Sequence, residues 1–316
     1  MSTHACALAE PAAAVQFAIC DRARTASLLD FHALVDALAT AVLELEAGLI
    51  VSPERLMVPL GEGGVLLSMP AAAADIGIHK LANVQPANAA AGLPTIHGAV
   101  TVCDAATGRP LCLLDGPEVT GRRTAALSLL AIRALSGKAP ESALLVGTGE
   151  QARHHLHALR ALHPGCRIRV RGLDAAASAA FCEAQGLDQA ASCAGKVPGD
   201  VDVVITLTTS AMPVYDEPAV PGRLVIGVGA FKPEMAELGK TTLDGSDVYA
   251  DDLPGARLEA GDLLRAGVDW GRVRPLAAAL RVAPDRTRPA VFKSVGTAAW
   301  DLAAARLAVR ALKAGR

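Results

Sequence analysis

The stretch Ser142–Ala152, SALLVGTGEQA, decides the fold class of this 316-residue chain. A run of apolar residues leads into the glycines Gly147 and Gly149, and an amphipathic pattern begins at Glu150. This order of strand, GxGxxA loop and helix predicts a dinucleotide-binding turn. Gly147 permits the tight turn, Gly149 lets the backbone approach a pyrophosphate, and Ala152 lets the helix pack closely on the strand. The free N–H groups at the start of the helix then face the phosphates.

The segments around this turn continue the alternation of strand and helix. The pattern predicts strands at 142–146, 167–171, 202–207 and 224–228, and helices at 120–136, 150–162 and 175–185. Such βαβ alternation indicates a parallel sheet with helices on both faces. The predicted fold is therefore α/β, with a Rossmann doubly wound parallel sheet.

The chain before this region has a different pattern of apolar and polar residues. Short β-like runs at 64–69, 76–81, 96–103 and 110–116 predict a mixed sheet with few helices, and helical patterns flank it at 31–45 and at 297–314. At roughly 100–200 residues per domain, the length indicates two domains.

The composition excludes several classes of protein. The net charge is −2 without a basic block, which argues against nucleic acid as a partner. No apolar run reaches the roughly 18–20 residues of a membrane span, and the N-terminus lacks the pattern of a signal peptide, so a cytoplasmic location is expected. The seven cysteines include no CxxC pair, so we expect free thiols in a reducing compartment. No cluster of metal ligands appears, and no metal site is predicted.

Three basic residues are candidates for binding an anion. Lys80 lies in a strand that ought to be half buried, so it either reaches solvent or points into a site. Thr120 is the predicted N-cap of a helix whose first turn contains Arg122 and Arg123. Arginines there oppose the helix dipole, so we expect them to hold a small anion together with the helix end, with solvated surface charge as the alternative. Arg55 alone would rank as surface.

The type of dinucleotide depends on the end of the second strand. Asp174 comes slightly late to bind a ribose hydroxyl, whereas Arg171 could pair with a 2′-phosphate. Either residue could instead be a solvated surface charge. Both NADH and NADPH remain open, with NADPH favoured.

Several stretches occur in an order that resembles the ornithine cyclodeaminase/μ-crystallin family. They are Met69–Ala71, Gly77–Lys80, Asn88 with Gly92–Thr95, Asp104 with Thr107–Gly108, Thr120–Ala126, Val146–Gly149, and Lys293–Gly296 with Asp301–Ala303. The resemblance implies a homodimer in which a Rossmann domain, residues 120–295, is inserted into a mixed α+β domain. That second domain, residues 1–119 with 296–316, would serve substrate binding and dimerisation.

The same resemblance implies roles for individual residues. Arg55, Lys80 and Arg123 would hold a substrate carboxylate, and Thr95 would lie with Lys80 close to the nicotinamide. The two arginines would lower the pKa of Lys80, which would then act as a general acid or as a further carboxylate ligand. The full set of expected cofactor contacts is Thr95, Arg123, Thr124, Gly147, Thr148, Gly149, Glu150, Gln151, Ala152, Arg171, Thr208, Val228, Ser294 and Gly296.

One departure from the family pattern bears on the reaction. Phe231 stands where cyclodeaminases have an aspartate that handles the second amine of the substrate. The resemblance is therefore closest to the ketimine reductases, which reduce Δ1-pyrroline-2-carboxylate and Δ1-piperideine-2-carboxylate to proline and pipecolate. An ornithine or lysine cyclodeaminase, an amino-acid dehydrogenase acting on pyruvate and ammonia, and a μ-crystallin-like protein that binds NADPH and a small ligand remain alternatives.

Overall fold

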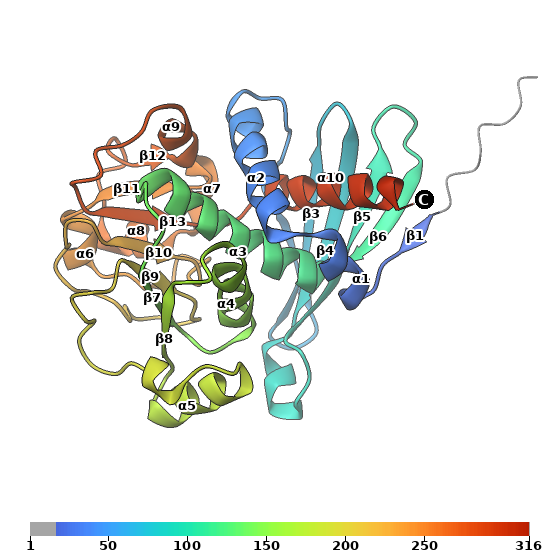
Figure 1. The fold of residues 1–316 in the computed structure, drawn as a ribbon. Helices are drawn as coiled ribbons and strands as arrows, with labels where there is room; N and C mark the ends of the chain where they lie inside the picture. The colour runs from blue at the N-terminus through green and yellow to red at the C-terminus, as the bar shows by residue number, and fades with distance from the viewer. Residues whose placement is uncertain (1–16, 316) are drawn as a thin grey trace, which may run out of the picture.

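Two β-sheets form the two halves of the computed structural model, which describes residues 17–315 (Figure 1). The first sheet has six strands in the order β1-β6-β5-β4-β3-β2. Its strands pair antiparallel except for β1 with β6. The strands are β1 (Ala18–Ile19), β2 (Leu56–Leu60), β3 (Gly64–Ala72), β4 (Ile76–Val84), β5 (Ile96–Asp104) and β6 (Pro110–Asp115).

The second sheet has seven strands, all parallel, in the order β12-β11-β13-β10-β9-β7-β8. The strands are β7 (Ser142–Val146), β8 (Arg167–Arg171), β9 (Val203–Thr206), β10 (Leu224–Gly227), β11 (Asp247–Ala250), β12 (Arg274–Pro275) and β13 (Ala290–Lys293). The prediction of a Rossmann-like parallel sheet is confirmed. Because all strands run the same way, the loops after β7, β9, β10 and β13 meet at one edge, where α/β proteins bind their ligands.

Helices cover both sheets. They are α1 (Arg22–Leu28), α2 (Phe31–Glu46), α3 (Gly116–Leu135), α4 (Glu150–Leu162), α5 (Ala175–Ala184), α6 (Lys240–Asp244), α7 (Leu253–Glu259), α8 (Gly261–Ala266), α9 (Leu276–Arg281) and α10 (Ala298–Ala314), with 3-10 turns η1 (Pro86–Ala91) and η2 (Gln189–Ala191). The chain leaves the first sheet through α3, builds the second sheet, and returns to the first with α10 (Figure 1).

Helix α3 begins earlier than the sequence pattern indicated. Its N-cap is Asp115, whose carboxylate accepts a hydrogen bond of 2.7 Å from Glu118 N. Thr120, the predicted N-cap, lies inside the helix and donates its hydroxyl to Gly116 O at 2.8 Å. The prediction that Arg122 and Arg123 lie in the first turn is therefore wrong. Pro117 is compatible with a first helical turn, so Asp115 and Pro117 were the signals for the true start.

The alternation of side chains in β4 explains where Lys80 points. Ile76, Ile78 and Lys80 are buried, whereas His79 and Leu81 are exposed. Side chains in a strand point alternately to opposite faces. Lys80 therefore points to the buried face of the sheet, toward α10, which packs on β3 and β4.

One hydrophobic core runs through both halves. It joins Val100 of β5 and Ile205 of β9 through Leu127 and Leu130 of α3. Helix α3 is buried along most of its length and packs against β5 on one side and β10 on the other.

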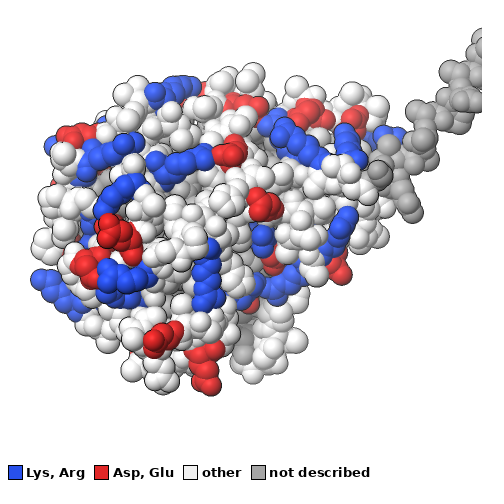
Figure 2. All heavy atoms as spheres, in the orientation of Figure 1, with Lys and Arg blue, Asp and Glu red and all other residues white. Residues whose placement is uncertain are grey.

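The surface carries both signs of charge, interspersed on the face drawn in Figure 2. Within residues 17–315, no single helix is long and apolar enough to cross a membrane; α1 and α2 pass that test only as a pair bent by 72°. The six cysteines in this range are free, and Cys6 lies outside it.

Candidate functional site

Lys80 and Arg123 meet on one carboxylate, that of Asp301 in the first turn of α10. Lys80 Nζ lies 3.1 Å from Asp301 Oδ2, and Arg123 Nε lies 3.2 Å from Asp301 Oδ1. The three side chains are 5%, 7% and 0% exposed. Two cations sharing one anion leave an excess positive charge in a buried place, which favours an anionic ligand there.

Arg55 reaches the same place through the loop after β13. Its Nη2 donates to Gly296 O at 2.8 Å and pairs with Glu259 Oε2 at 2.9 Å. Gly296 has a φ of 79°, and a Cβ there would lie 2.9 Å from Arg123 Nη1. Glycine is thus required both by the backbone conformation and by the guanidinium packed on it. The structure brings Arg55, Lys80 and Arg123 together around this loop.

The pKa of Lys80 is lowered to about 8. Burial is the largest cause, Asp301 opposes it, and the positive charges of Arg123 and Arg55 add to the lowering. The direction and the influence of the two arginines were predicted from the sequence, but the larger cause is burial and the role of Asp301 was missed. An aspartate within a long Ala/Leu helix was the signal that could have found it.

Asp251, at the end of β11, fixes the loop that carries Ser294 and Gly296. Its carboxylate accepts hydrogen bonds from Ser294 Oγ at 3.0 Å, from the backbone N–H groups of Val295 and Gly296 at 2.9 Å each, and from Trp300 Nε1 at 3.1 Å. The sequence did not indicate this residue, because its partners lie more than forty positions away.

Glu237 plays the same part for the loops after β9 and β10. One carboxylate oxygen accepts the hydroxyl of Thr208 at 2.8 Å, and the other accepts the backbone N–H groups of Gly229 and Ala230. Burial raises the pKa of Glu237, and the nearby Lys293 opposes the shift. Thr208 and Val228, two expected cofactor contacts, therefore lie on loops that a buried carboxylate holds together.

The glycine loop fits a pyrophosphate. Gly147 has a φ of 124°, and a Cβ there would lie 2.7 Å from Leu207 O. Gly149 is the N-cap of α4 without a side-chain cap, and a Cβ on it would meet open space. The first N–H groups of α4 thus face a space that side chains leave clear, while Ala152 is fully buried against the sheet. These are the requirements for a dinucleotide phosphate at a helix N-terminus.

Arg171 ends β8, and Asp174 follows it three positions later. The carbonyl of Arg171 accepts a hydrogen bond from Gly147 N at 2.7 Å, so Arg171 adjoins the glycine loop. Its Nη2 donates to Gly195 O, and its Nε is buried without a partner. Asp174 caps α5 by accepting from Ala177 N at 2.7 Å. One oxygen of the carboxylate that was considered for the ribose therefore caps the helix.

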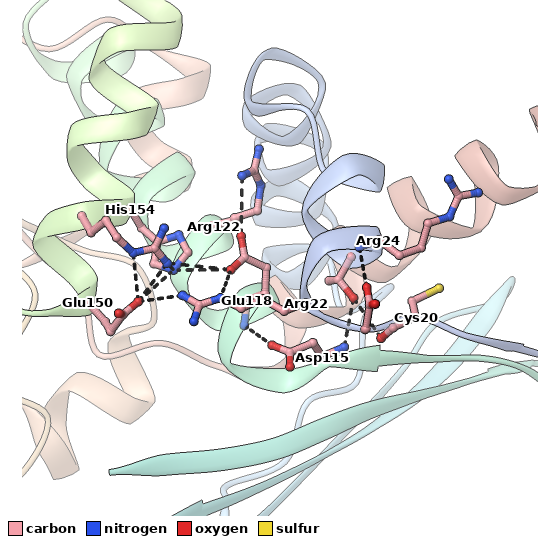
Figure 3. A network of polar contacts seen from close by, with 11 residues as sticks. Cys20, Arg22, Arg24, Asp115, Glu118, Arg122, Glu150 and His154 are labelled. Atoms are coloured by element: carbon pink, nitrogen blue, oxygen red, sulfur yellow. Dashed lines mark hydrogen bonds and ion pairs between the residues drawn. The ribbon is translucent and has the colours of Figure 1, made fainter. Parts of the chain in front are cut away.

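Arg122 does not join Arg123, because neighbouring helix residues point in different directions. Its guanidinium donates to Leu29 O at 2.9 Å and lies 4.1 Å from the ring centroid of Phe31. It belongs to a polar network around Glu118 that links α1, α3 and α4 (Figure 3). The expectation that both arginines hold one anion is wrong.

Two residues that were expected to contact the cofactor, Thr95 and Glu150, lie apart from the basic cluster formed by Arg55, Lys80 and Arg123. Thr95 is exposed between η1 and β5, five positions before Val100, the residue that pairs with Lys80. At about 3.3 Å per residue this is roughly 16 Å along the strand. Glu150 is largely exposed and pairs with Arg22 (Figure 3). It also pairs with Arg153. Among the described residues, no group of three or more acidic, histidine or cysteine side chains could hold a metal ion.

A cavity of about 490 Å³ opens between the two halves beside Arg55. Its wall includes Ser52, Arg55, Met69, Asp252, Glu259 and Gly296. Of the three basic residues only Arg55 forms part of the wall, and Arg123 lies behind Gly296, where a Cβ would come within 2.9 Å of its Nη1. A small ligand in this cavity can therefore reach the loop around which the basic cluster gathers.

Residues 16–315 match the sequence pattern of the ornithine cyclodeaminase/mu-crystallin family. The chain belongs to this family. It is 54% identical over 299 residues to Delta(1)-pyrroline-2-carboxylate reductase 2 of Burkholderia ambifaria, covering 94% of this chain and 96% of the relative. The same values hold for the Delta(1)-pyrroline-2-carboxylate/Delta(1)-piperideine-2-carboxylate reductase of Azospirillum brasilense.

A solved structure shares the fold of this family member. It is that of Thermococcus litoralis Delta(1)-pyrroline-2-carboxylate reductase in complex with NADH and L-proline, with a TM-score of 0.83 and 25% identity over 95% of this chain and 98% of that one. The resemblance predicted from the sequence is confirmed. At the place where the family's cyclodeaminases are expected to have an aspartate, this chain has Phe231, partly buried, with Lys232 Nζ 5.9 Å from its ring centroid.

Proposed function

We propose that this protein is an NAD(P)H-dependent oxidoreductase that reduces the C=N bond of cyclic ketimine carboxylates, Δ1-pyrroline-2-carboxylate and Δ1-piperideine-2-carboxylate, to proline and pipecolate. The observation that carries the proposal is that Lys80 and Arg123 share Asp301 at the start of α10, directly after the loop at Gly296 on which Arg55 and Arg123 lie. This loop lies at the edge of the parallel sheet where a dinucleotide binds. The names of the two relatives that share 54% of their residues with this chain support it.

Arg55 and Arg123 bind the substrate carboxylate in this proposal. A guanidinium can hold a carboxylate through two parallel hydrogen bonds, which fixes the plane of the ligand as well as its position. The buried excess of positive charge at Arg123 and Lys80 adds to the attraction. Orientation of this kind can lower a barrier by up to roughly 7–11 kcal/mol in ideal intramolecular cases.

Lys80 is the proposed catalytic residue. Bound NADH or NADPH supplies the hydride. Because its pKa is lowered to about 8, Lys80 carries a proton at neutral pH and can release it more readily than an exposed lysine. It either protonates the imine nitrogen or remains a third ligand of the carboxylate.

The cofactor contacts are proposed on the same basis. Gly147 and Gly149 face the pyrophosphate, and the loops with Thr208, Val228, Ser294 and Gly296 line the nicotinamide half. Arg171, a cation at the end of β8 whose carbonyl accepts a hydrogen bond from Gly147 N, supports a preference for NADPH over NADH.

A homodimer through the first sheet is part of the proposal. Antiparallel sheets with one covered face usually present polar residues on the other. Here the edge strand β2 exposes Leu56, Met57 and Val58, and Leu81 and Ile96 are exposed on β4 and β5. A second copy of this chain would cover these side chains. Light scattering of the wild-type protein and of Met57→Glu tests whether the protein is a dimer and whether a charge at this position separates the two copies. A cytoplasmic location belongs to the same proposal.

The division into two domains also remains a proposal. Residues 120–295 would form the cofactor domain, and residues 1–119 with 296–316 the substrate and dimerisation domain. Helix α3 is continuous across residues 119 and 120, so it would connect the two domains as a single rod.

The experiment is a reduction assay. Purified protein is mixed with the five-membered and the six-membered cyclic imino acid, each with NADH and with NADPH, and loss of reduced cofactor is followed with identification of proline or pipecolate. Release of ammonia from ornithine or lysine would instead identify a cyclodeaminase, against which Phe231 argues. If the protein binds NADH or NADPH but neither ketimine oxidises the bound cofactor, the proposal is contradicted.

A further inference from the structure

Glu259 forms an ion pair with Arg55, one of the two arginines that are proposed to bind the substrate. Its Oε2 lies 2.9 Å from Arg55 Nη2, and the two side chains are only 17% and 13% exposed. Arg55 precedes β2 in the first half, whereas Glu259 is the last residue of α7 in the second half. Both line the cavity between the halves. The ion pair therefore joins the two walls of the cavity.

We propose that Glu259 determines ligand specificity by standing in for the substrate carboxylate on Arg55, from which the substrate displaces it. The inference rests on the proposed function. Arg55 Nη2 already donates to Gly296 O at 2.8 Å, and its ionic partner is Glu259. Because Glu259 Oε2 lies 2.9 Å from Arg55 Nη2, a second carboxylate that pairs with Nη2 needs the position that Glu259 holds. Only ligands that compete with an internal carboxylate are then accepted.

The groups around Glu259 determine its protonation once the substrate has displaced it. Burial raises its pKa, Arg55 opposes the shift, and Asp251, Asp252 and Glu54 raise it further. When a substrate takes Arg55, Glu259 loses its cation and is left among acids. Its pKa then rises again, because like charges and burial both disfavour the ionised form. Binding of a carboxylate is thus coupled to uptake of a proton.

Two other groups near the site could also take up protons. Lys80 has a pKa of about 8, so at pH 6.5 it is already protonated and contributes little. Asp252 has a pKa raised to about 6, chiefly by burial and then by Asp251. Asp252 caps α7 through Gly255 N at 3.3 Å, and Arg55 lowers its pKa, so it too takes up protons when a carboxylate occupies Arg55. Comparison of Glu259→Gln with Asp252→Asn therefore identifies the responsible group.

The test uses pyrrole-2-carboxylate, a planar analogue that cannot be reduced, with the full-length enzyme saturated with NADP+. Calorimetric titrations at pH 6.5 in two buffers of different ionisation enthalpy measure the protons taken up. We expect net uptake by the wild-type enzyme and a larger loss of that uptake in Glu259→Gln than in Asp252→Asn. At pH 7.5 the Glu259→Gln variant is expected to bind the analogue about tenfold more tightly, because the competing charge is gone.

A matched control is Glu46→Gln. Glu46 lines the same cavity but pairs with Arg281 at 2.5 Å, so this variant is expected to behave like the wild type. NADPH binding, followed by fluorescence, verifies that each variant is folded.

The outcomes separate the two proposals. Wild-type binding without proton uptake, or a Glu259→Gln variant with native NADPH affinity that binds the analogue no more tightly, would overturn the role of Glu259. If Glu259→Gln does not fold, the uptake that remains in Asp252→Asn decides. If the wild-type enzyme neither binds the analogue nor reduces the cyclic imino acids, the proposed function itself fails and this inference falls with it.

Discussion

Lys80 and Asp301 form an ion pair of 3.1 Å between β4 and α10, with side chains that are 5% and 0% exposed. Arg123 shares the same carboxylate at 3.2 Å. Asp301 is therefore the counter-ion that allows two cations to remain inside the protein. Neither cation would be stable at this depth without it, since an unpaired buried charge is costly.

Asp301→Asn is expected to lower the free energy of unfolding by about 3–5 kcal/mol, because it leaves two buried cations without their anion. It also removes the group that opposes the effect of burial on Lys80, so the pKa of Lys80 falls below about 8. Urea unfolding and the pH profile of kcat/KM measure the two effects. Asp75→Asn is the control, because Asp75 is exposed and pairs with Arg306 at the surface. A wild-type pH profile in Asp301→Asn would contradict the assignment.

Arg123→Ala is expected to raise the KM for the cyclic imino acid by about 100-fold, since a charged hydrogen bond to the carboxylate is lost. The affinity for NADPH should change little. Arg122→Ala is a matched control one position away, because Arg122 packs on Phe31 and not on Asp301. Steady-state kinetics with both variants test this, and an unchanged KM in Arg123→Ala would remove it from the substrate site.

The rate should fall at alkaline pH. Because the pKa of Lys80 is lowered to about 8, chiefly by burial, its proton and its positive charge are present below that pH and lost above it. We expect kcat/KM to be flat from neutral pH to near 8 and then to fall about tenfold per pH unit. Lys80→Arg should move this decrease in kcat/KM beyond the accessible pH range and lower kcat. If the decrease stays near pH 8 in Lys80→Arg, another group is titrating.

The two glycines of the phosphate loop should respond differently to alanine. Gly147→Ala introduces a Cβ 2.7 Å from Leu207 O at a φ of 124°, so the folded state should be destabilised by about 1–3 kcal/mol. Gly149→Ala meets open space, so stability should be nearly unchanged while the dissociation constant for NADPH rises at least about tenfold. Thermal unfolding and cofactor titration measure the two quantities. Equal losses of stability in both variants would count against this account.

Arg171→Ala should weaken NADPH binding about tenfold while leaving NADH binding nearly unchanged, because the Nε of Arg171 is the unpartnered donor beside the glycine loop. Parallel titrations with the two cofactors test the preference. Arg167→Ala, at the opposite end of β8, is the control. A loss shared equally by NADH and NADPH would mean that Arg171 supports the fold of the loop instead.

The sequence predicted the elements that have a clear period. Strands β7 and β8 and helix α4 lie where the pattern placed them, because long apolar runs and amphipathic repeats are local signals. The four-residue strand β13 was not predicted, although it lies between β10 and β11 and precedes Ser294. Its sequence AVFK ends in a lysine, so it lacks the continuous apolar run that marked β9 and β10, which are equally short.

The candidate site was predicted only in part. Arg55, Lys80 and Arg123 were identified through the family resemblance, and a lysine in an apolar strand pointed to a partner. The pairing of Lys80 with Asp301 was missed, because the two residues are 221 positions apart along the chain; only the position of an acid within an Ala/Leu helix marked Asp301. Asp251 and Glu237 were missed because folding brings them to distant loops and no local pattern marks them.

Helix α3 couples the thermal unfolding of the two halves of the protein. Because its buried side chains belong to a core shared by Val100 of one sheet and Ile205 of the other, neither half can unfold without exposing the apolar surface of its neighbour. The free energies of the halves are thus coupled, and heating should give a single cooperative transition in calorimetry despite the two sheets. The residues that face each other across the cleft would then be assembled and lost together.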